Sequence, residues 1–435
     1  MPDERLFDAL SYWNIWGPGE FDVGVSRDAT ERLRPWLDRK EILAICGMRR
    51  SGKSTLMRQL LSRLVESGVS PDETLFVNFE DPVFLDRPLD VATLDRVFDT
   101  FFELGRPSPS AVPRLFLDEI HNVAGWSRWV RARVESGRAQ ITVTGSSAQL
   151  LEPDVATVLT GRNITWTLWP LSFRELLRFR GAPIDATAMP APARIRQELA
   201  RYIRYGGLPE VALAEDAQVQ VALLKQYFRD ILYRDVVSRH QIRDVRALER
   251  VAHHYLVNTG NLSTFNRLKN SYGLAMDQVR SYTAFLEQCY MIRQVDRYSP
   301  KVSSQSRLPR KVYAADTGVR NAVAFRFSED IGRLAETVVH NQLVRDPDVR
   351  VFYFAGAGEC DFVVWSGDRP VRAIQVCYEA DRLPEREVSG VIEAMAAVGA
   401  MEGLILTDSL EQEIDSGGKR IRVRPLWRWL CEAAA

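Results

Sequence analysis

The sequence predicts an α/β protein whose first large domain is built on a doubly wound parallel sheet. Three observations support this: five short apolar runs lie between residues 41 and 170, the runs are rich in Val, Ile, Phe and Leu, and the segments between them suit helices. Strands buried on both faces of a parallel sheet are continuously apolar, because helices cover both faces. The predicted strands are 42–46, 74–79, 114–117, 140–144 and 164–168, with helices at 54–66 and 148–159.

The composition predicts a globular, multidomain chain. Its 435 residues are 46% hydrophobic and carry 57 basic and 57 acidic side chains. This length predicts about two to four domains, and the balanced charge gives no general attraction to nucleic acid or membrane. The five cysteines lie far apart, which argues against a zinc site and fits a reducing compartment. We find no signal core and no apolar run of roughly 18 residues, so we expect a cytoplasmic protein without a membrane partner.

Five parts follow one another along the chain. Residues 1–40 are expected to form an N-terminal segment with a helix near 30–38, and residues 41–170 the sheet domain. Residues 171–238 look mostly helical, broken at Gly206-Gly207. Residues 239–328 carry a second helical set. Residues 329–435 predict another α/β domain, with a helix at 331–344 and strands at 351–354, 362–365, 373–378 and 403–407.

A phosphate-binding loop follows the first predicted strand. Residues 47–54 read Gly-Met-Arg-Arg-Ser-Gly-Lys-Ser, with the spacing G-x-x-x-x-G-K-S directly before a predicted helix. Glycines let the backbone N–H groups wrap the phosphates, and the helix aims its positive end at them. Lys53 is expected to reach the β and γ phosphates and Ser54 to hold Mg²⁺, so ATP and Mg²⁺ are the expected cofactors. The predicted nucleotide-binding residues are Gly47, Arg50, Ser51, Gly52, Lys53, Ser54 and Thr55; Arg50 can serve phosphate or an acidic neighbour.

An acidic strand end supplies the second half of the predicted site. The strand at 114–117 runs into Asp118 and Glu119. Asp118 suits Mg²⁺ binding, mostly through water, and Glu119 suits a base that orients and deprotonates the attacking water. The alternative is an ordinary strand followed by a solvated acidic turn.

Four further polar residues are candidates for the same site. Thr144 or Ser146, at the tip of the fourth strand, can sense the γ phosphate; the alternative is an N-cap for the next helix. Arg162 precedes the fifth strand and can act as an arginine finger on a neighbouring subunit, or simply lie on the surface at a helix end. Asn78 can restrain Glu119 or belong to a strand-end turn.

These residues, in this order, resemble the AAA-type ATPases. More closely, Gly-Met-Arg-Arg-Ser-Gly-Lys-Ser, Leu-Asp-Glu-Ile-His, Thr-Gly-Ser-Ser, Trp-Pro-Leu-Ser-Phe-Arg-Glu-Leu and Gly-Gly-Leu-Pro-Glu are similar to a family of uncharacterised prokaryotic AAA ATPases with a C-terminal domain of unknown function. The resemblance implies a P-loop AAA-type core with a helical lid, ATP hydrolysis that drives conformational change, and homo-oligomers. It leaves the substrate open, and we identify no second sensor Arg in residues 171–238.

Residues 245–298 resemble a winged-helix domain. Predicted helices at 245–258, 264–272 and 277–288 are joined by a cap at Ser263 and a turn at Gly273, and 291–297 and 311–315 suit the wing strands. The third helix of such domains enters the major groove, while residues 301–311 can contact phosphates. The alternative is a winged helix used only for packing. The predicted DNA-contacting residues are Gln278, Arg280, Ser281 and Tyr282.

The last part resembles the restriction-endonuclease-like fold. Glu336 lies on a predicted helix, Asp361 opens a strand and Gln375 lies on the next strand. Active members carry a Lys two residues after the last acidic position, where it helps to activate water beside Mg²⁺. Cys377 stands there instead and supplies no fixed charge. We therefore expect an inactive binding module, with residual nuclease activity as the alternative.

The leading functional hypothesis is an oligomeric ATPase that acts on DNA or a nucleoprotein complex. Fold analogy carries the DNA part of this hypothesis. Two alternatives stay open: a nucleotide-dependent signalling switch that recruits a protein partner, and an ATP-gated nuclease.

Overall fold

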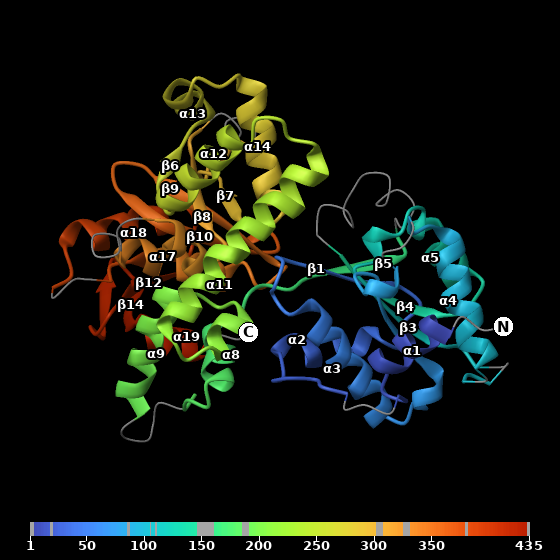
Figure 1. Ribbon diagram of the computed structural model, residues 1–435. Helices are drawn as coiled ribbons and strands as arrows, with labels where there is room; N and C mark the ends of the chain where they lie inside the picture. The colour runs from blue at the N-terminus through green and yellow to red at the C-terminus, as the bar shows by residue number, and fades with distance from the viewer. Residues whose placement is uncertain are drawn as a thin grey trace. The chain divides into compact units, whose positions relative to one another are not determined.

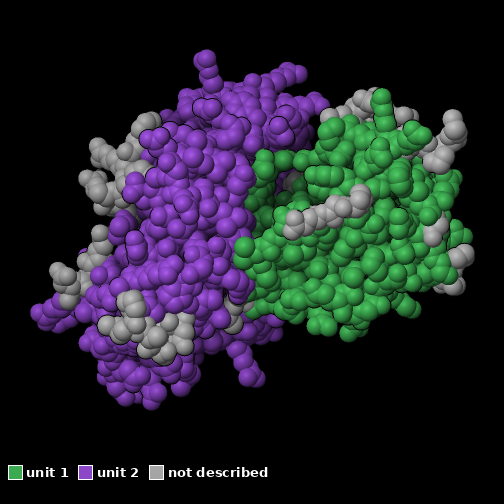
Figure 2. Space-filling view, turned by 60° about the horizontal axis from the view of Figure 1, so that its bottom comes forward, with its two compact units in different colours: residues 1–168 green, residues 169–435 purple. Residues whose placement is uncertain are grey.

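The computed structural model of the protein describes residues 4–17, 21–84, 88–104, 106–108, 111–145, 161–184, 191–301, 308–324, 331–378 and 382–432. The chain forms two compact units, residues 1–168 and 169–435, which Figure 2 shows in green and purple. No helix in the described ranges is both long and apolar enough to cross a bilayer. The predicted boundaries at 40, 170, 238 and 328 stay predictions.

The first unit contains the predicted parallel sheet (Figure 1). Its five strands lie in the order β2-β3-β4-β1-β5, and every neighbouring pair is parallel. This confirms the α/β fold and all five predicted strands, with bounds that differ by one residue at most. The strands are β1 Ile42–Cys46, β2 Thr74–Asn78, β3 Arg114–Asp118, β4 Gln140–Thr144 and β5 Asn163–Thr167. The predicted helix at 148–159 lies outside the described residues.

Helices pack on the faces of this sheet, where alternate side chains of each strand point. Leu43 and Ile45 of β1 and Phe116 of β3 share one buried cluster with α2 (Asp28–Leu33) and α3 (Lys53–Glu66). The helix α4 (Val91–Glu103) packs on α5 (Trp126–Glu135), with the Phe98 and Trp129 rings 5.8 Å apart.

The N-terminal helix α1 (Glu4–Trp13) covers the β2 edge of the sheet. Just after it, the Asn14 amide donates to the Phe76 carbonyl at 2.8 Å and accepts from the Phe76 N–H at 2.6 Å. An unpaired edge strand would otherwise present these backbone groups. The described residues 4–17 and 21–40 therefore belong to the first unit.

The second unit begins with helices, as predicted for residues 171–238. Asp316 explains the Gly206-Gly207 break, because its carboxylate accepts the Gly207 N–H at 2.7 Å and caps α16 through Val319. A Cβ at Gly206 would lie 2.1 Å from that carboxylate, so only glycine fits. The helices are α8 Phe173–Phe179, α9 Ala191–Tyr205, α10 Pro209–Leu213, α11 Ala217–Asp230, a π-helix Ile231–Ser238, and α16 Thr317–Val323.

The helices and strands predicted between 245 and 315 are present. Thr264 caps α13 by accepting from the Arg267 N–H at 3.2 Å, so the predicted cap at Ser263 is wrong by one residue. Gly273 ends α13 in the left-handed conformation, with φ +66°. The elements are α12 Val245–Val257, β6 Leu262–Ser263, α13 Phe265–Tyr272, α14 Met276–Gln288, β7 Ile292–Val295 and β8 Arg310–Ala314, with the antiparallel sheet order β6-β8-β7.

A six-stranded mixed sheet forms the rest of the second unit. Its order is β13-β14-β12-β11-β10-β9; β9, β10 and β11 are antiparallel, and α18 connects the parallel strands β11 and β12. The pair β13 and β14 and the helices α18 and α19 were not predicted. The elements are α17 Ile331–Leu343, β9 Val349–Ala355, β10 Glu359–Ser366, β11 Arg369–Val376, α18 Glu385–Val398, β12 Glu402–Thr407, β13 Gln412–Ser416, β14 Lys419–Pro425 and α19 Leu426–Glu432.

Candidate functional site

The strand order of the first unit explains how its polar residues meet. In β2-β3-β4-β1-β5 the strand β4 lies between β1 and β3, and parallel strands end at one edge of the sheet. Open α/β sheets bind ligands at this carboxyl edge, where the strand order changes direction. The loop after β1, the acids after β3 and the tip of β4 therefore converge.

Glycine is required at both ends of the loop after β1. Gly47 has φ +148°, and a Cβ there would lie 2.2 Å from the Leu168 carbonyl oxygen. Gly52 has φ +94° and precedes the first turn of α3. Arg50 is exposed and left-handed, with φ +67°, a conformation that costs a non-glycine residue energy. This strained loop is suited to point its N–H groups inward.

Lys53 is buried at the start of α3. Its ammonium lies 3.3 Å from the Gly47 carbonyl oxygen and 3.4 Å from that of Met48. Its nearest carboxylate is Glu119, at 3.8 Å. The ammonium therefore lies between the loop and the acids of β3, as a phosphate-binding Lys would. Ser54 and Thr55 follow in the same first turn and are half-buried.

Asp118 is the most buried acid of the site, with 1% of its surface exposed. Its Oδ1 accepts a hydrogen bond from the Thr144 hydroxyl. Burial, followed by the Glu119 charge, raises the pKa of Asp118 to about 6, against the lowering effects of hydrogen bonds from Thr144 and Ser54 and of the Lys53 charge. An uncompensated buried carboxylate is costly, so this position favours a bound cation.

Two orphaned polar atoms fit the implied nucleotide and metal. The Ser51 hydroxyl and Asp118 Oδ2 are buried and receive no hydrogen bond of normal geometry. Buried polar groups without partners are rare in proteins. Ser51 lies in the loop, and Asp118 supplies the hard oxygen that Mg²⁺ prefers, with the Ser54 hydroxyl beside it. These residues fit ATP and Mg²⁺.

Thr144 and Glu119 are held together at the strand ends. The Glu119 backbone N–H donates to the Thr144 hydroxyl oxygen at 2.9 Å, so Thr144 bridges Asp118 and Glu119. Glu119 has a left-handed backbone, with φ +53°. Its carboxylate lies between Lys53 and the His121 imidazole, whose Nδ1 is 3.2 Å from Oε2. The other candidate sensor, Ser146, lies outside the described residues.

Two residues of this site were missed from the sequence. His121 stands two positions after Glu119, and only the tight turn Ile120–Asn122 brings it back to that carboxylate. Arg27 is 3% exposed and donates to the Ser51 carbonyl of the loop at 2.7 Å. Its distance of 24 positions from Ser51 leaves no local signal.

Asn78 pairs in register with Asp118 on the neighbouring strand β3, whereas Arg162 lies at the opposite end of the strands. The Asn78 side chain accepts the Glu80 N–H at 2.9 Å, which is the strand-end turn. Arg162 precedes β5 at the sheet edge opposite the loop, since Ile42 pairs with Asn163. It forms an exposed ion pair with Glu135, with Nε 2.8 Å from Oε1. Both predicted uses of Arg162 stay open.

The predicted DNA-contacting residues on α14 divide into exposed and buried ones. Arg280 and Ser281 are exposed, and the Arg280 guanidinium lies 3.8 Å from Asp277. Tyr282 is wrong as an exposed contact: it is 5% exposed, and its hydroxyl donates to the Asp244 carbonyl at 3.2 Å. Gln278 is half-buried and donates to the Tyr282 hydroxyl. The 3.6-residue helical period turns positions 278 and 282 toward α12.

The predicted nuclease-like residues come together around an unpredicted lysine. Lys311 of β8 lies 2.7 Å from Glu336 Oε1 and 2.8 Å from Asp361 Oδ1. The Asp361 Oδ2 accepts the Val376 N–H, and Gln375 accepts the Asp361 N–H at 3.0 Å while donating to Glu387. No group of three or more metal-ligating acidic, His or Cys side chains occurs in the described part of the chain.

Charge balance holds this cluster together. Burial lowers the pKa of Lys311, but the Asp361 and Glu336 carboxylates outweigh burial and hold it above the usual range. Burial, followed by the Asp361 charge, raises the pKa of Glu336 to about 7, although Lys311 and the Tyr313 hydroxyl lower it. The Lys311 ammonium thus supplies a positive charge to this cluster, which Cys377, at the position of the Lys of active nucleases, does not supply.

Comparison with known proteins agrees with the geometry of the first unit. Residues 39–177 match the model of an AAA domain, and residues 196–330 match a domain of unknown function. An uncharacterized protein of Methanocaldococcus jannaschii is 28% identical over 93% of this chain and 90% of its own length. One of Haemophilus influenzae is 27% identical over 80% of this chain and 85% of its own length.

A solved structure, the Aeropyrum pernix Orc1 protein in complex with DNA, superposes with a TM-score of 0.30 at 16% identity, over 70% of this chain and 94% of that one.

Proposed function

We propose that this AAA-domain ATPase hydrolyses ATP with Glu119 as the base and couples hydrolysis to conformational change on DNA or a nucleoprotein complex. The carrying observation is the hydrogen-bonded group at the sheet edge: Thr144 bridges Asp118 and Glu119, with Lys53 3.8 Å from Glu119. Phosphoryl transfer requires a cation that binds the phosphates, ligands for Mg²⁺ and a base that positions the attacking water, and these residues can supply all three.

Each residue has a separate proposed task. The Lys53 ammonium binds the β and γ phosphates with the loop N–H groups. Glu119 takes the proton from the attacking water, and the His121 imidazole, 3.2 Å from its carboxylate, orients it. Ser54 and Asp118 would hold Mg²⁺, which when bound neutralises phosphate charge. Thr144 keeps both acids in register.

Steady-state ATP turnover tests the catalytic part of this proposal. Glu119→Gln should lower kcat by roughly 10²–10⁴-fold while ATP is still bound, because the base is lost and the shape kept. Lys53→Ala should remove ATP binding itself. Glu103→Gln is the matched control, since this exposed Glu ends α4 in the same unit. Equal turnover of the Glu119 and Glu103 variants would refute the assigned base.

The DNA part rests on the arrangement of α12, α13, α14 and the β6-β8-β7 sheet, with Arg280 and Ser281 exposed on α14. Duplex, branched and single-stranded DNA should each be added to the turnover assay, and binding should be measured against salt. Arg280→Ala should weaken binding, whereas the exposed Arg350→Ala on β9 should not. Turnover that ignores every DNA, without binding at low salt, would favour the protein-recruiting switch.

We propose further that the six-stranded sheet binds without cutting. Lys311 forms ion pairs with Glu336 and Asp361, the two carboxylates that a metal-dependent nuclease would need to bind its metal. The Gln375 amide oxygen accepts the Asp361 N–H and its amide nitrogen donates to Glu387, so both ends of this side chain are engaged within the cluster. Nucleic acid incubated with Mg²⁺ should therefore stay intact. Cutting that Asp361→Ala abolishes would refute this proposal and establish the ATP-gated nuclease instead.

We propose that Arg162 serves a neighbouring subunit of a homo-oligomer, since it lies at the edge opposite its own phosphate loop. Arg162→Ala should then lower turnover without weakening ATP binding. Breaking the surface pair with Glu135→Gln is the control. Equal turnover of both variants and the wild type would assign Arg162 to the surface.

A further inference from the structure

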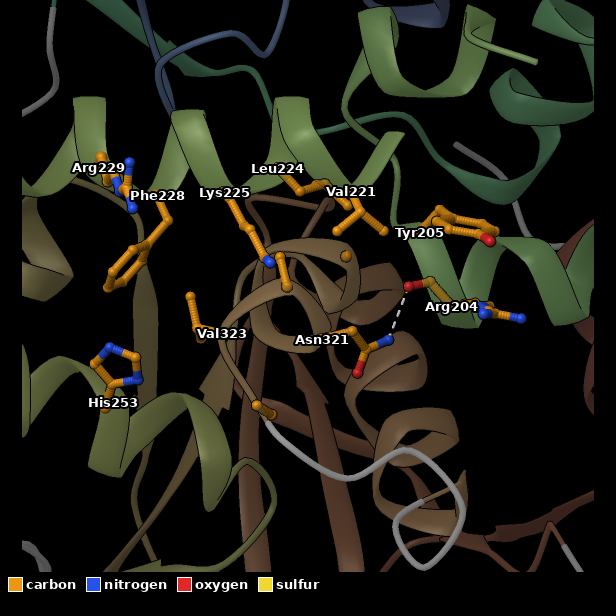
Figure 3. A pocket seen from close by; sticks show the side chains of 13 residues that line it. Arg204, Tyr205, Val221, Leu224, Lys225, Phe228, Arg229, His253, Asn321 and Val323 are labelled. Carbon is orange, nitrogen blue, oxygen red and sulfur yellow. Dashed lines mark hydrogen bonds between the residues drawn. The ribbon is translucent and has the colours of Figure 1, made fainter. Parts of the chain in front are cut away.

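A pocket opens in the second unit between α9, α11, α12 and α16 (Figure 3). Its volume is about 450 Å³, within the range of roughly 300–1,000 Å³ typical of small-molecule sites. All residues that line it fall between positions 204 and 324. The pocket therefore lies inside the domain of unknown function at 196–330, and it shares no residue with the proposed ATP site.

The floor of the pocket is apolar. Leu224 and Phe228 of α11 are buried, and Figure 3 shows Val323 of α16 facing them from the opposite wall. The Phe228 ring meets the His253 imidazole of α12 edge to face, with centroids 5.3 Å apart. Such a floor suits an apolar or aromatic body, because ring faces and edges provide large contact area at little entropic cost.

Basic side chains border this floor. Lys225 and Arg229 lie one turn apart on α11. The Lys225 side chain points into the pocket, and its ammonium lies between Val323 and Asn321 in the view of Figure 3. Among the described residues that line the pocket, none is Asp or Glu. An ammonium and a guanidinium next to an apolar floor, without an acidic lining residue, favour an anionic group on the ligand.

One wall of the pocket is already fixed. The Asn321 amide donates to the Ile203 carbonyl at 3.0 Å and to the Arg204 carbonyl at 2.8 Å, the latter drawn in Figure 3. Gly318 packs so closely on α9 that a Cβ would lie 2.0 Å from the Tyr205 carbonyl oxygen. A wall fixed before binding lowers the ordering cost of a ligand.

We propose that this pocket binds a small organic anion, with an aromatic or aliphatic body beside a phosphate or carboxylate group. Lys225 and Arg229 hold the anionic group, and Phe228, His253 and Val323 contact the body. The proposal is independent of ATP hydrolysis, since it concerns only residues of the second unit.

The fluorescent probe 8-anilinonaphthalene-1-sulfonate combines both required features, an aromatic body and an anion. Titrations use the full chain in the Lys53→Ala background, which suppresses nucleotide binding at the phosphate loop. Lys225→Glu should weaken probe binding by roughly tenfold or more, since charge-assisted contacts contribute this much. Lys269→Glu, at an exposed position on α13, is the matched control and should bind as before. Val323→Phe should fill the pocket and weaken binding without any change of charge.

Competition then identifies the ligand class. Adenosine monophosphate and decanoate test a phosphate on an aromatic body and a carboxylate on an aliphatic one, with adenosine and decanol as uncharged counterparts. Displacement by either anion, and not by its uncharged counterpart, supports the proposal. Equal binding by the Lys225 and Lys269 variants overturns it, as does unchanged binding by the Val323 variant or equal displacement by the uncharged compounds. Circular dichroism of each variant checks that the fold is retained.

Discussion

Replacing Lys311 with Met tests the interpretation of the second unit most directly. This change keeps the length of the side chain but removes the ammonium that lies 2.7 Å from Glu336 and 2.8 Å from Asp361. Both carboxylates are buried, so the variant leaves two like charges without a counter-charge. Breaking a buried ion pair in this way costs about 3–5 kcal/mol, and we expect a loss of that size at pH 8.

The loss should depend on pH with a defined sign. The pKa of Glu336 is raised to about 7 in the folded protein, above its ordinary 4.5, so the folded state retains a proton that the unfolded chain releases. Stability from this group is therefore complete below about pH 4.5 and is lost as the pH rises through 7. Without Lys311 the proton is retained more strongly. The Lys311→Met defect should therefore be smaller at pH 5.5 than at pH 8.

Hydrogen–deuterium exchange of peptides from α17 and β10 measures this defect locally, which matters because a chain of two units need not unfold in one step. Lys301→Met, at an exposed position, is the matched control. Adding Glu336→Gln and Asp361→Asn to Lys311→Met should recover much of the loss, because no unpaired charge then remains buried. A Lys311→Met change within about 1 kcal/mol of the control at pH 8 would refute the reasoning.

The remaining predictions concern single positions. Glu336→Gln should reduce the loss of stability between pH 5 and pH 8 by about 1–3 kcal/mol, measured by urea unfolding at each pH; parallel curves for variant and wild type would contradict this. Asp316→Ala should cost about 2–4 kcal/mol, since it removes a helix cap and orphans a buried N–H, whereas the exposed cap variant Asp216→Ala should cost about 1 kcal/mol; equal costs would count against the double role. Gly47→Ala should abolish ATP binding because its Cβ has no room, while Gly137→Ala, with nothing within 4 Å, should leave binding intact in a fluorescent-nucleotide titration.

The sequence by itself determined the parallel sheet, the phosphate loop and the acidic strand end. Each of these is encoded locally: a buried strand needs a continuous apolar run, and the loop needs glycine at positions 47 and 52, where φ is positive. Once the strands were known to be parallel, their carboxyl ends had to share one edge. Asp118, Glu119 and Thr144 could therefore be assigned to one site before any distance was known.

Only the tertiary structure decided which residues from distant parts of the chain contact one another. Lys311 is 25 positions from Glu336 and 50 from Asp361, and Arg27 is 24 from Ser51; no local spacing relates them. The sequence predicted Tyr282 of α14 as an exposed DNA contact, but packing on α12 buries it. The pocket of α9, α11, α12 and α16 likewise joins segments more than 100 residues apart. Local propensity and periodicity determine the helices and strands. Contacts between distant segments depend on how those helices and strands pack, and a short sequence motif carries no information about that packing.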